Sequence, residues 1–228
     1  MTTALKSEAI VYPDSDGNPM AENTKQFRWI VLIKENLEYL FVHNENVFVA
    51  GDLLWYPVEG RPDIRVAPDA LVVFGRPKGD RGSYRQWQEG NIPPQVVFEV
   101  LSPSNTVLEM TRKALFYNRY GVEEYYIYDP DTNVLTGFQR QEGELNPIEA
   151  MDGWISPHLG IRFELTPTTL NIYDPQGNLF LSPTEMRARA EQERLRADRE
   201  SQRAEEEKAR ADRLAEKLRE LGIDPQEM

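Results

Sequence analysis

Hydrophobic side chains between residues 24 and 173 recur with two periods, one helical and one extended. Residues 24–41 carry them every three or four positions, which predicts an amphipathic helix, and its expected apolar face comprises Phe27, Ile30, Val31, Ile33, Leu37 and Leu40. A second helix is predicted over 106–120. Apolar runs bounded by Pro, Gly and Asp predict strands, at 47–57, 66–75, 95–102, 124–129, 134–140, 161–165 and 169–173. This order predicts an α/β fold in which helices flank a mixed β-sheet.

The composition changes at Ser182, beyond which aromatic residues are absent and Glu, Arg and Ala dominate. Ser182-Pro183-Thr184-Glu185 has the residues of a helix start, and Gly222 and Pro225 mark an end, so a single long helix is predicted. Its apolar residues recur every seven positions (Ala190, Ala197, Ala204, Ala211, Leu218), which is the coiled-coil period. Alanine buries little area, so a solvated single helix held by i,i+4 ion pairs is an equal alternative. We expect two domains, residues 1–181 and 182–228.

Two carboxylates interrupt the predicted strands. Glu99 lies inside the run Val96–Val100, and Asp69 directly precedes the run Ala70–Phe74. An ionised carboxyl group that is buried without a partner costs several kcal/mol, so each acid needs a cation, a donor or a proton. If the two strands are neighbours, the acids converge at one sheet edge, with the Val100 carbonyl as a further oxygen ligand. Such a set of oxygen atoms suits Mg²⁺ or Mn²⁺.

A cation bound to a phosphoryl group is usually accompanied by a positive side chain. Lys113 is the candidate, because it lies on the helix that follows the Glu99 strand. Each residue also has a simpler explanation. Pro68-Asp69 is a common turn dipeptide, Glu99 could be satisfied by an arginine or a helix N-terminus, and Lys113 could pair with Glu109 one turn away.

The charge of the chain bears on any nucleic-acid partner. The formal net charge is −12, which argues against sequence-independent adhesion to nucleic acid. Residues 182–228 hold 11 basic and 13 acidic side chains and contribute −2, so the remainder carries −10. The loop 75–85 forms a local basic cluster of Arg76, Lys78, Arg81 and Arg85. Arginines near Trp87 suit phosphate contact and base stacking, and a solvated glycine-rich connection explains the same composition.

These residues resemble the PD-(D/E)xK restriction-endonuclease-like superfamily and, more narrowly, the Uma-two family within it. The resemblance covers about residues 10 to 175 and rests on five stretches: Asp16-Gly17-Asn18-Pro19-Met20, Ala67-Pro68-Asp69-Ala70, Val97-Phe98-Glu99-Val100-Leu101-Ser102-Pro103, Lys113-Ala114-Leu115-Phe116-Tyr117, and Gly121-Val122-Glu123-Glu124-Tyr125-Tyr126-Ile127-Tyr128-Asp129-Pro130.

The resemblance implies a hydrolase of nucleic-acid phosphodiester bonds that depends on Mg²⁺ or Mn²⁺, with DNA as the favoured substrate. Asp69 and Glu99 would be metal ligands, and Glu22 and Glu109 are candidates for further acids. The chain departs from the motif at the lysine position, where Leu101 stands. The resemblance implies that Lys113 supplies the amine from the next helix.

The remaining features limit the class of protein. The chain has no cysteine, no apolar run long enough to span a membrane and no signal-peptide pattern at residues 1–16, so a cytoplasmic protein without a membrane partner is expected. The first hypothesis is a metal-dependent endonuclease. The alternative is a catalytically inactive binding or assembly module with the nuclease fold, which forms a homo-oligomer, such as a dimer, through its C-terminal helix.

Overall fold

The computed structural model describes residues 10–15, 17 and 20–220. The chain divides after Ser182 into two compact units. Several residues named above lie outside the described part of the chain: Asp16, Asn18 and Pro19 of the N-terminal stretch, and Gly222 and Pro225 of the predicted helix end.

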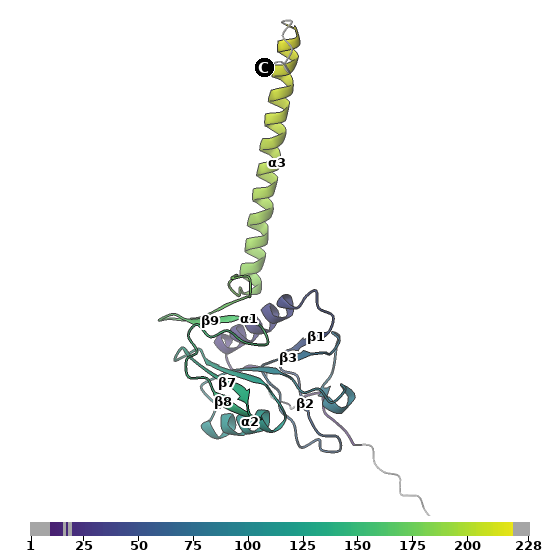
Figure 1. Cartoon of the computed structure of the whole chain (residues 1–228), viewed down its shortest axis with the longest axis vertical. Coiled ribbons are helices and arrows are strands. Elements are labelled where there is room, and N and C mark those ends of the chain that lie inside the picture. The colour runs from purple at the N-terminus through teal and green to yellow at the C-terminus, as the bar shows by residue number, and fades with distance from the viewer. Residues whose placement is uncertain (1–9, 16, 18–19, 221–228) are drawn as a thin grey trace, which may run out of the picture. The chain divides into compact units, whose positions relative to one another are not determined.

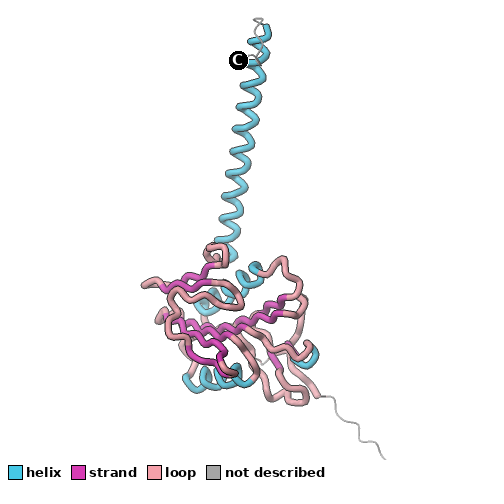
Figure 2. The backbone as a smooth tube through the Cα atoms, in the orientation of Figure 1, coloured by secondary structure: helices cyan, strands magenta, loops and turns pink. Residues whose placement is uncertain are grey.

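A six-stranded mixed sheet forms the centre of the first unit (Figures 1 and 2), in the order β1-β3-β5-β6-β7-β8. Its strands are β1 Val47–Ala50, β3 Ala70–Phe74, β5 Val96–Val100, β6 Glu124–Asp129, β7 Val134–Gln141 and β8 Glu144–Pro147. Strands β5 and β6 are parallel, and all other neighbours are antiparallel. The parallel pair requires a crossover, which the chain makes with a helix.

Two helices cover opposite faces of this sheet (Figure 1). Helix α1 spans Thr24–Leu40, and the Asn23 side chain caps it by accepting from the N–H groups of Lys25 and Gln26. Helix α2 spans Val107–Arg119, and Thr106 caps it by accepting from the N–H of Glu109. Such caps satisfy donors that a helix N-terminus would otherwise leave without partners. Helix α2 is the crossover between β5 and β6.

The sheet separates two hydrophobic clusters. On one face, Ile30, Ile33 and Leu37 of α1 pack with alternate residues of β3 and β5 and with the hairpin of β9 (Arg162–Leu165) and β10 (Leu170–Tyr173). On the other face, aromatic side chains of α2 and β6 pack with Leu71, Val73 and Val97, next to the short parallel pair of β2 (Trp55–Tyr56) and β4 (Tyr84–Arg85). A 3-10 turn, Gln86–Gln88, follows β4.

The fold class predicted from the sequence is confirmed: a mixed sheet lies between helices, and each predicted helix and strand has a counterpart. One detail is wrong, because Phe27 is 47% exposed. The buried stripe of α1 runs through Gln26, Ile30, Ile33 and Leu37, and Phe27 lies about 100° around the helix from Gln26. The sequence pattern also missed β4, which has two residues, and β8, which has four and is mostly exposed.

The second unit is the helix α3, Pro183–Glu220. Its described side chains are exposed, including Leu195 and Leu214, with the exception of Met186 and Ala215, which are partly covered. Arg189 and Glu193 form an i,i+4 ion pair at 3.1 Å. Both alternatives for this helix, a coiled coil and a solvated single helix, remain open. Among the described residues, no helix is long and apolar enough to cross a membrane.

Candidate active site

The antiparallel register of β3 and β5 brings Asp69 and Glu99 together. Ala70 pairs with Phe98, so Asp69 and Glu99 are opposite each other in the next position of the ladder. Their side chains lie on the α2 face, because Leu71, Val73 and Val97 lie there and side chains alternate along a strand. The Oδ2 atom of Asp69 accepts a hydrogen bond of 2.6 Å from the N–H of Val100.

Helix α2 supplies the partners of Glu99. The Nζ atom of Lys113 lies 2.8 Å from Oε2 of Glu99, and the Tyr117 hydroxyl donates to Oε1. These two residues are four positions apart, so they lie on the same face of α2. Glu99 is only 3% exposed. Its buried carboxylate is thus held by one cation and one neutral donor, and the pairing of Lys113 with Glu109 is not formed.

The charges in this cluster shift several pKa values. Burial and the charge of Glu99 raise the pKa of Asp69 well above its usual 3.8, and the Val100 N–H and Lys113 oppose this shift. For Lys113, burial acts to lower the pKa, but the charge and hydrogen bond of Glu99 raise it overall. The lysine therefore stays positive, whereas Asp69 holds a proton more readily than an exposed aspartate does.

Two tyrosine hydroxyl groups lie beside these acids. Burial, together with the charge of Glu99, raises the pKa of Tyr117 well above its ordinary value, so it remains a phenol and donates to Glu99. Tyr125 is fully buried, and burial followed by the charges of Glu99 and Asp69 raises its pKa. Among the described residues, the Tyr125 hydroxyl has no hydrogen-bond partner. A buried hydroxyl without a partner is rare in proteins, and a water molecule or an ion is a usual explanation for one.

The oxygen atoms around Asp69 and Glu99 include ligands of the kind that a divalent cation prefers. No group of three or more His, Cys, Asp or Glu side chains forms a metal cage within the described part of the chain. Mg²⁺, however, is commonly bound by one or two carboxylates, with water or phosphate oxygens completing its shell. The two carboxylates fit such a site, because a cation would offset the Glu99 charge that helps to raise the pKa of Asp69. Both oxygens of Glu99 also have partners on α2. The Val100 carbonyl, expected as a further ligand, accepts a hydrogen bond of 2.9 Å from Nε2 of Gln26.

The further acids named from the sequence belong to a neighbouring network at the end of β5. The Glu22 carboxylate accepts from Ser102 at 2.8 Å and also from Ser104. The Asn105 amide donates to both oxygens of Glu109, at 3.2 and 3.3 Å. Within the described residues, neither acid bonds to the Asp69–Glu99 pair. The structure therefore brings Asp69, Glu99 and Lys113 together, whereas Glu22 and Glu109 bond to the turn between β5 and α2. The charge of Glu109 still helps to raise the pKa of Lys113.

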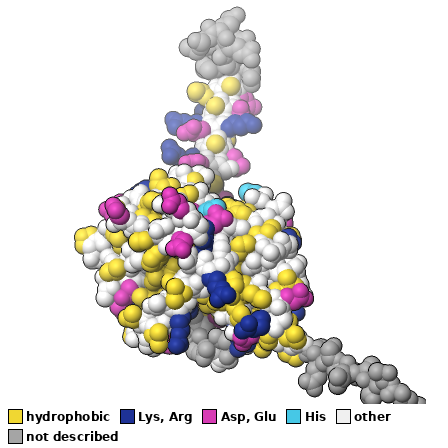
Figure 3. Space-filling view, turned by 60° about the horizontal axis from the view of Figure 1, so that its bottom comes forward, with side chains coloured by type: hydrophobic (Ala, Val, Ile, Leu, Met, Phe, Trp, Pro, Cys, Tyr) yellow, Lys and Arg dark blue, Asp and Glu magenta, His cyan; other side chains and the backbone are white. Residues whose placement is uncertain are grey.

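The basic residues of loop 75–85 are engaged with the protein itself. Arg76 and Arg81 both pair with Glu89, at 3.1 and 2.7 Å. Lys78 donates to the carbonyls of Phe41 and Val42, and the Arg85 guanidinium lies 5.2 Å from the ring centre of Tyr12. Figure 3 shows acidic and basic side chains interspersed on one face of the molecule, without a continuous basic strip.

Two buried polar residues were not identified from the sequence. Gln26 links α1 to the end of β5, and no feature of the helical pattern marks it. Glu124 opens an apolar run, as Asp69 does, and is 1% exposed. Its carboxylate accepts from the Tyr126 hydroxyl and the His158 N–H, each at 2.8 Å, and from the Ser156 hydroxyl. A carboxylate in an apolar run is the feature that identified Glu99, and the same feature could have identified Glu124. The partners of Glu124 anchor the loop before β9 to the sheet.

The mixed sheet with α1 and α2 on opposite faces makes this an α/β protein. The sequence model of the Uma2 family, described as "Putative restriction endonuclease", matches residues 17–172. The match covers more than half of the chain, which therefore belongs to the Uma2 family. A crystal structure of a "putative nuclease belonging to DUF820" from Anabaena variabilis ATCC 29413 aligns with a TM-score of 0.44 and 15% identity, over 60% of this chain and 73% of that chain. No curated protein matches the sequence.

Proposed function

We propose that this protein is a metal-dependent endonuclease that hydrolyses phosphodiester bonds of nucleic acid, with DNA as the favoured substrate. The observation that carries the proposal is the ion pair between Lys113 and Glu99, formed beside Asp69 on the α2 face of the sheet. Three charged side chains from separate elements gather there at a cost in desolvation, which is typical of a functional site. Membership in the Uma2 family agrees with this activity.

Each residue has a role that its environment suits. Asp69 and Glu99 would hold Mg²⁺ or Mn²⁺, and the bound ion would activate water and neutralise charge on the phosphate. Lys113 keeps its proton because of Glu99, so it serves as a cation that stabilises negative charge on the attacked phosphate rather than as a general base. The Tyr117 hydroxyl fixes the orientation of the Glu99 carboxylate.

Lys113 replaces the lysine that the family motif places two residues after the acid. At that position stands Leu101, which cannot hold a charge. The Lys113 amine reaches Glu99 from α2, so a cation is delivered to the same acid from a different element. Lys113 can therefore supply the positive charge although Leu101 is apolar.

The test is cleavage of single- and double-stranded DNA and of RNA, each with Mg²⁺ and with Mn²⁺. Asp69→Ala and Glu99→Ala should each abolish the cleavage that the wild type shows. Glu149→Ala, which removes an exposed acid, is the matched control and should cleave as the wild type does. Equal cleavage by all four proteins would assign the activity to a contaminant or another site, and no cleavage by any of them would favour the second function below.

The second candidate is a non-catalytic binding or assembly module that oligomerises through α3. Two observations favour it: both oxygens of Glu99 already have protein partners, and α3 carries the seven-residue alanine stripe. Removal of residues 183–228 should then lower the number of chains in the particle. An unchanged number of chains after this removal would rule out assembly through the helix. For either function we place the protein in the cytoplasm, since it has no cysteine.

A further inference from the structure

Two arginines of α2 differ from all other arginines of the first unit. This unit contains ten arginines, and eight of them form an ion pair or a hydrogen bond with the protein. Arg112 and Arg119 form neither within the described part of the chain, and Arg119 contacts only the Tyr120 ring, 5.6 Å from its centre. Both arginines are exposed. Each therefore offers the five donors of a guanidinium group to a partner outside the chain.

The two arginines lie on one face of α2. They are seven residues apart, which is almost two full turns and about 10.5 Å along the helix axis. Leu108 and Leu115, which are 58% and 65% exposed, alternate with them on the same face. We call this surface the α2 stripe, which consists of Leu108, Arg112, Leu115 and Arg119.

The α2 stripe begins beside the candidate active site. Arg112 directly precedes Lys113, whose amine pairs with Glu99 at 2.8 Å. Consecutive residues of a helix point about 100° apart, so α2 directs Lys113 inward to the acids and the two arginines outward. The helix holds three cations and a single acid, Glu109, which accepts from the Asn105 amide. The outer surface of α2 is thus locally positive on an acidic protein.

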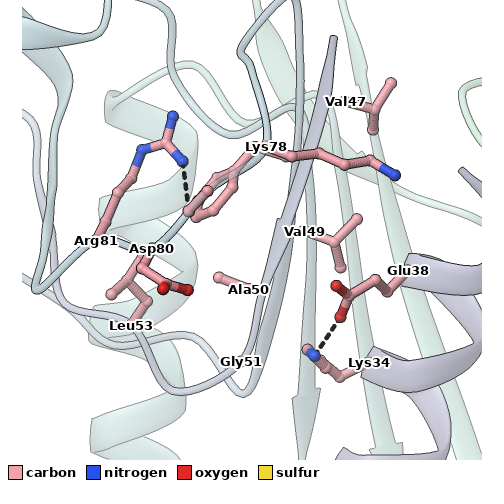
Figure 4. A pocket seen from close by; sticks show the side chains of 12 residues that line it. Lys34, Glu38, Val47, Val49, Ala50, Gly51, Leu53, Lys78, Asp80 and Arg81 are labelled. Carbon is pink, nitrogen blue, oxygen red and sulfur yellow. Dashed lines mark hydrogen bonds and ion pairs between the residues drawn. The ribbon is translucent and has the colours of Figure 1, made fainter. Parts of the chain in front are cut away.

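The cations that line the pocket along β1 already have partners. This pocket of about 470 Å³ is lined by Lys34, Lys78 and Arg81, among others (Figure 4). Lys34 pairs with Glu38, and Arg81 pairs with Glu89. Lys78 donates to two backbone carbonyls. A phosphate in this pocket would have to compete with the protein for each cation, whereas a phosphate at the α2 stripe would not.

We propose that the α2 stripe binds the sugar–phosphate backbone of the DNA substrate, and that Arg112 and Arg119 each contact a phosphate. A guanidinium group binds phosphate through two parallel hydrogen bonds. Leu108 and Leu115 offer apolar area to the deoxyribose rings. Such contacts fix the position of the strand and do not read its sequence. This inference rests on the proposed function, because it takes DNA as the substrate that reaches Lys113.

The binding is expected to be weak and to depend on few charges. The formal net charge of −12 opposes the approach of a polyanion. Two phosphate contacts predict that the logarithm of the binding constant falls with the logarithm of the salt concentration with a slope of about −2. This slope counts the contacts, so it separates a loss of phosphate contacts from a general loss of affinity.

The test is the binding of a labelled DNA duplex to the full chain, measured by fluorescence anisotropy in EDTA at several salt concentrations. EDTA prevents metal-dependent cleavage, so binding is measured by itself. Arg112→Ala and Arg119→Ala should each weaken binding at least about threefold and make the salt slope shallower by about one. Both side chains are exposed, so the fold should not change.

Two further variants serve as controls. Arg112→Lys keeps the charge but not the paired hydrogen bonds, so the salt slope should equal that of the wild type while the affinity stays lower. Arg28→Ala removes an exposed arginine from α1, on the other face of the sheet, and should bind DNA as the wild type does.

A parallel cleavage assay separates this inference from the proposed function. If the wild type cleaves DNA and both alanine variants bind it as the wild type does, the inference is wrong and the nuclease proposal stands. If both variants lose binding and no protein cleaves DNA with Mg²⁺ or Mn²⁺, the α2 stripe binds DNA and the nuclease proposal fails.

Three other results would overturn the inference. The first is no DNA binding by the wild type at the lowest salt concentration. The second is tighter binding of polyglutamate with the same loss in both alanine variants, which would assign the α2 stripe to an acidic polypeptide. The third is tighter binding of an RNA of the same sequence with that loss, which would assign it to RNA.

Discussion

Lys113 and Glu99 form an ion pair of 2.8 Å between a helix and a strand that are separated by the turn at Ser102–Thr106. The acid is the more deeply buried partner, and its second oxygen is held by Tyr117. An ion pair in this position contributes less to stability than its geometry suggests, because both charges lose hydration. Replacement of one of the two charged residues should therefore destabilise the protein far more than replacement of both.

Lys113→Met should lower the free energy of unfolding by about 3 kcal/mol, because it leaves the Glu99 charge without its cation. The double variant Lys113→Met with Glu99→Gln should recover most of this loss, since no charge remains to be compensated. Urea denaturation at pH 7 measures both values. A double variant as unstable as the single one would show that Lys113 acts by packing and not by charge. Neither variant should cleave nucleic acid.

Asp69→Asn should stabilise the protein at neutral pH. In the wild type, the folded state keeps the Asp69 proton to a higher pH than the unfolded chain, whose aspartates ionise near 3.8. Between these two pKa values the folded state binds more protons, so the free energy of unfolding falls as the pH rises. Asparagine does not titrate and still accepts from the Val100 N–H.

Urea denaturation from pH 4 upward should therefore show a smaller decline for Asp69→Asn than for the wild type. Added Mg²⁺ should raise the midpoint of the wild type more than that of the variant, because a ligand that binds the folded state stabilises it. Identical pH profiles for the two proteins would contradict the raised pKa of Asp69.

The two tyrosines beside the acids give a matched comparison. Tyr117→Phe removes a donor from buried Glu99 and should cost about 1–3 kcal/mol of stability. Tyr125→Phe removes a buried hydroxyl that has no partner among the described residues, so the free energy of unfolding should change by less than about 0.5 kcal/mol or increase. Equal losses in thermal or urea denaturation would mean that the Tyr125 hydroxyl is bonded in solution.

Glu124→Ala should destabilise the fold by about 3 kcal/mol, because Tyr126, Ser156 and the His158 N–H lose their common acceptor. Glu124→Gln keeps one acceptor oxygen and should cost less. Denaturation of both variants beside Glu149→Ala, an exposed control, measures the difference. A Glu124→Ala variant as stable as the control would show that the loop before β9 does not depend on this anchor.

The sequence predicted the fold because its signals are local. Helix α1 and strand β5 have clear periods, and their predicted limits differ from the observed ones by one or two residues. The gathering of Asp69 and Glu99 could be expected only if their strands were neighbours, and the β3–β5 register confirms that condition. Whether these residues are catalytic stays a prediction.

Other features could not be predicted, because they arise from tertiary contacts. Gln26 looks like any polar residue of a surface helix, and only the packing of α1 places it against the Val100 carbonyl. Glu124 and Glu99 carry the same sequence signal. Their different surroundings, neutral donors in one case and a lysine in the other, become visible only in three dimensions.

Consecutive side chains of β5 point to opposite faces of the sheet, so neighbouring residues contact different surroundings. Phe98 and Val100 fill the cluster under α1, whereas Glu99 between them faces α2. Neighbouring residues of this short strand are thus constrained differently. Packing in the core constrains those on one face of the sheet, and charge constrains the one on the other face. A line of descent that lost Glu99 would also have to replace Lys113, whose largely buried amine would otherwise lose its carboxylate, while Phe98 and Val100 could stay fixed.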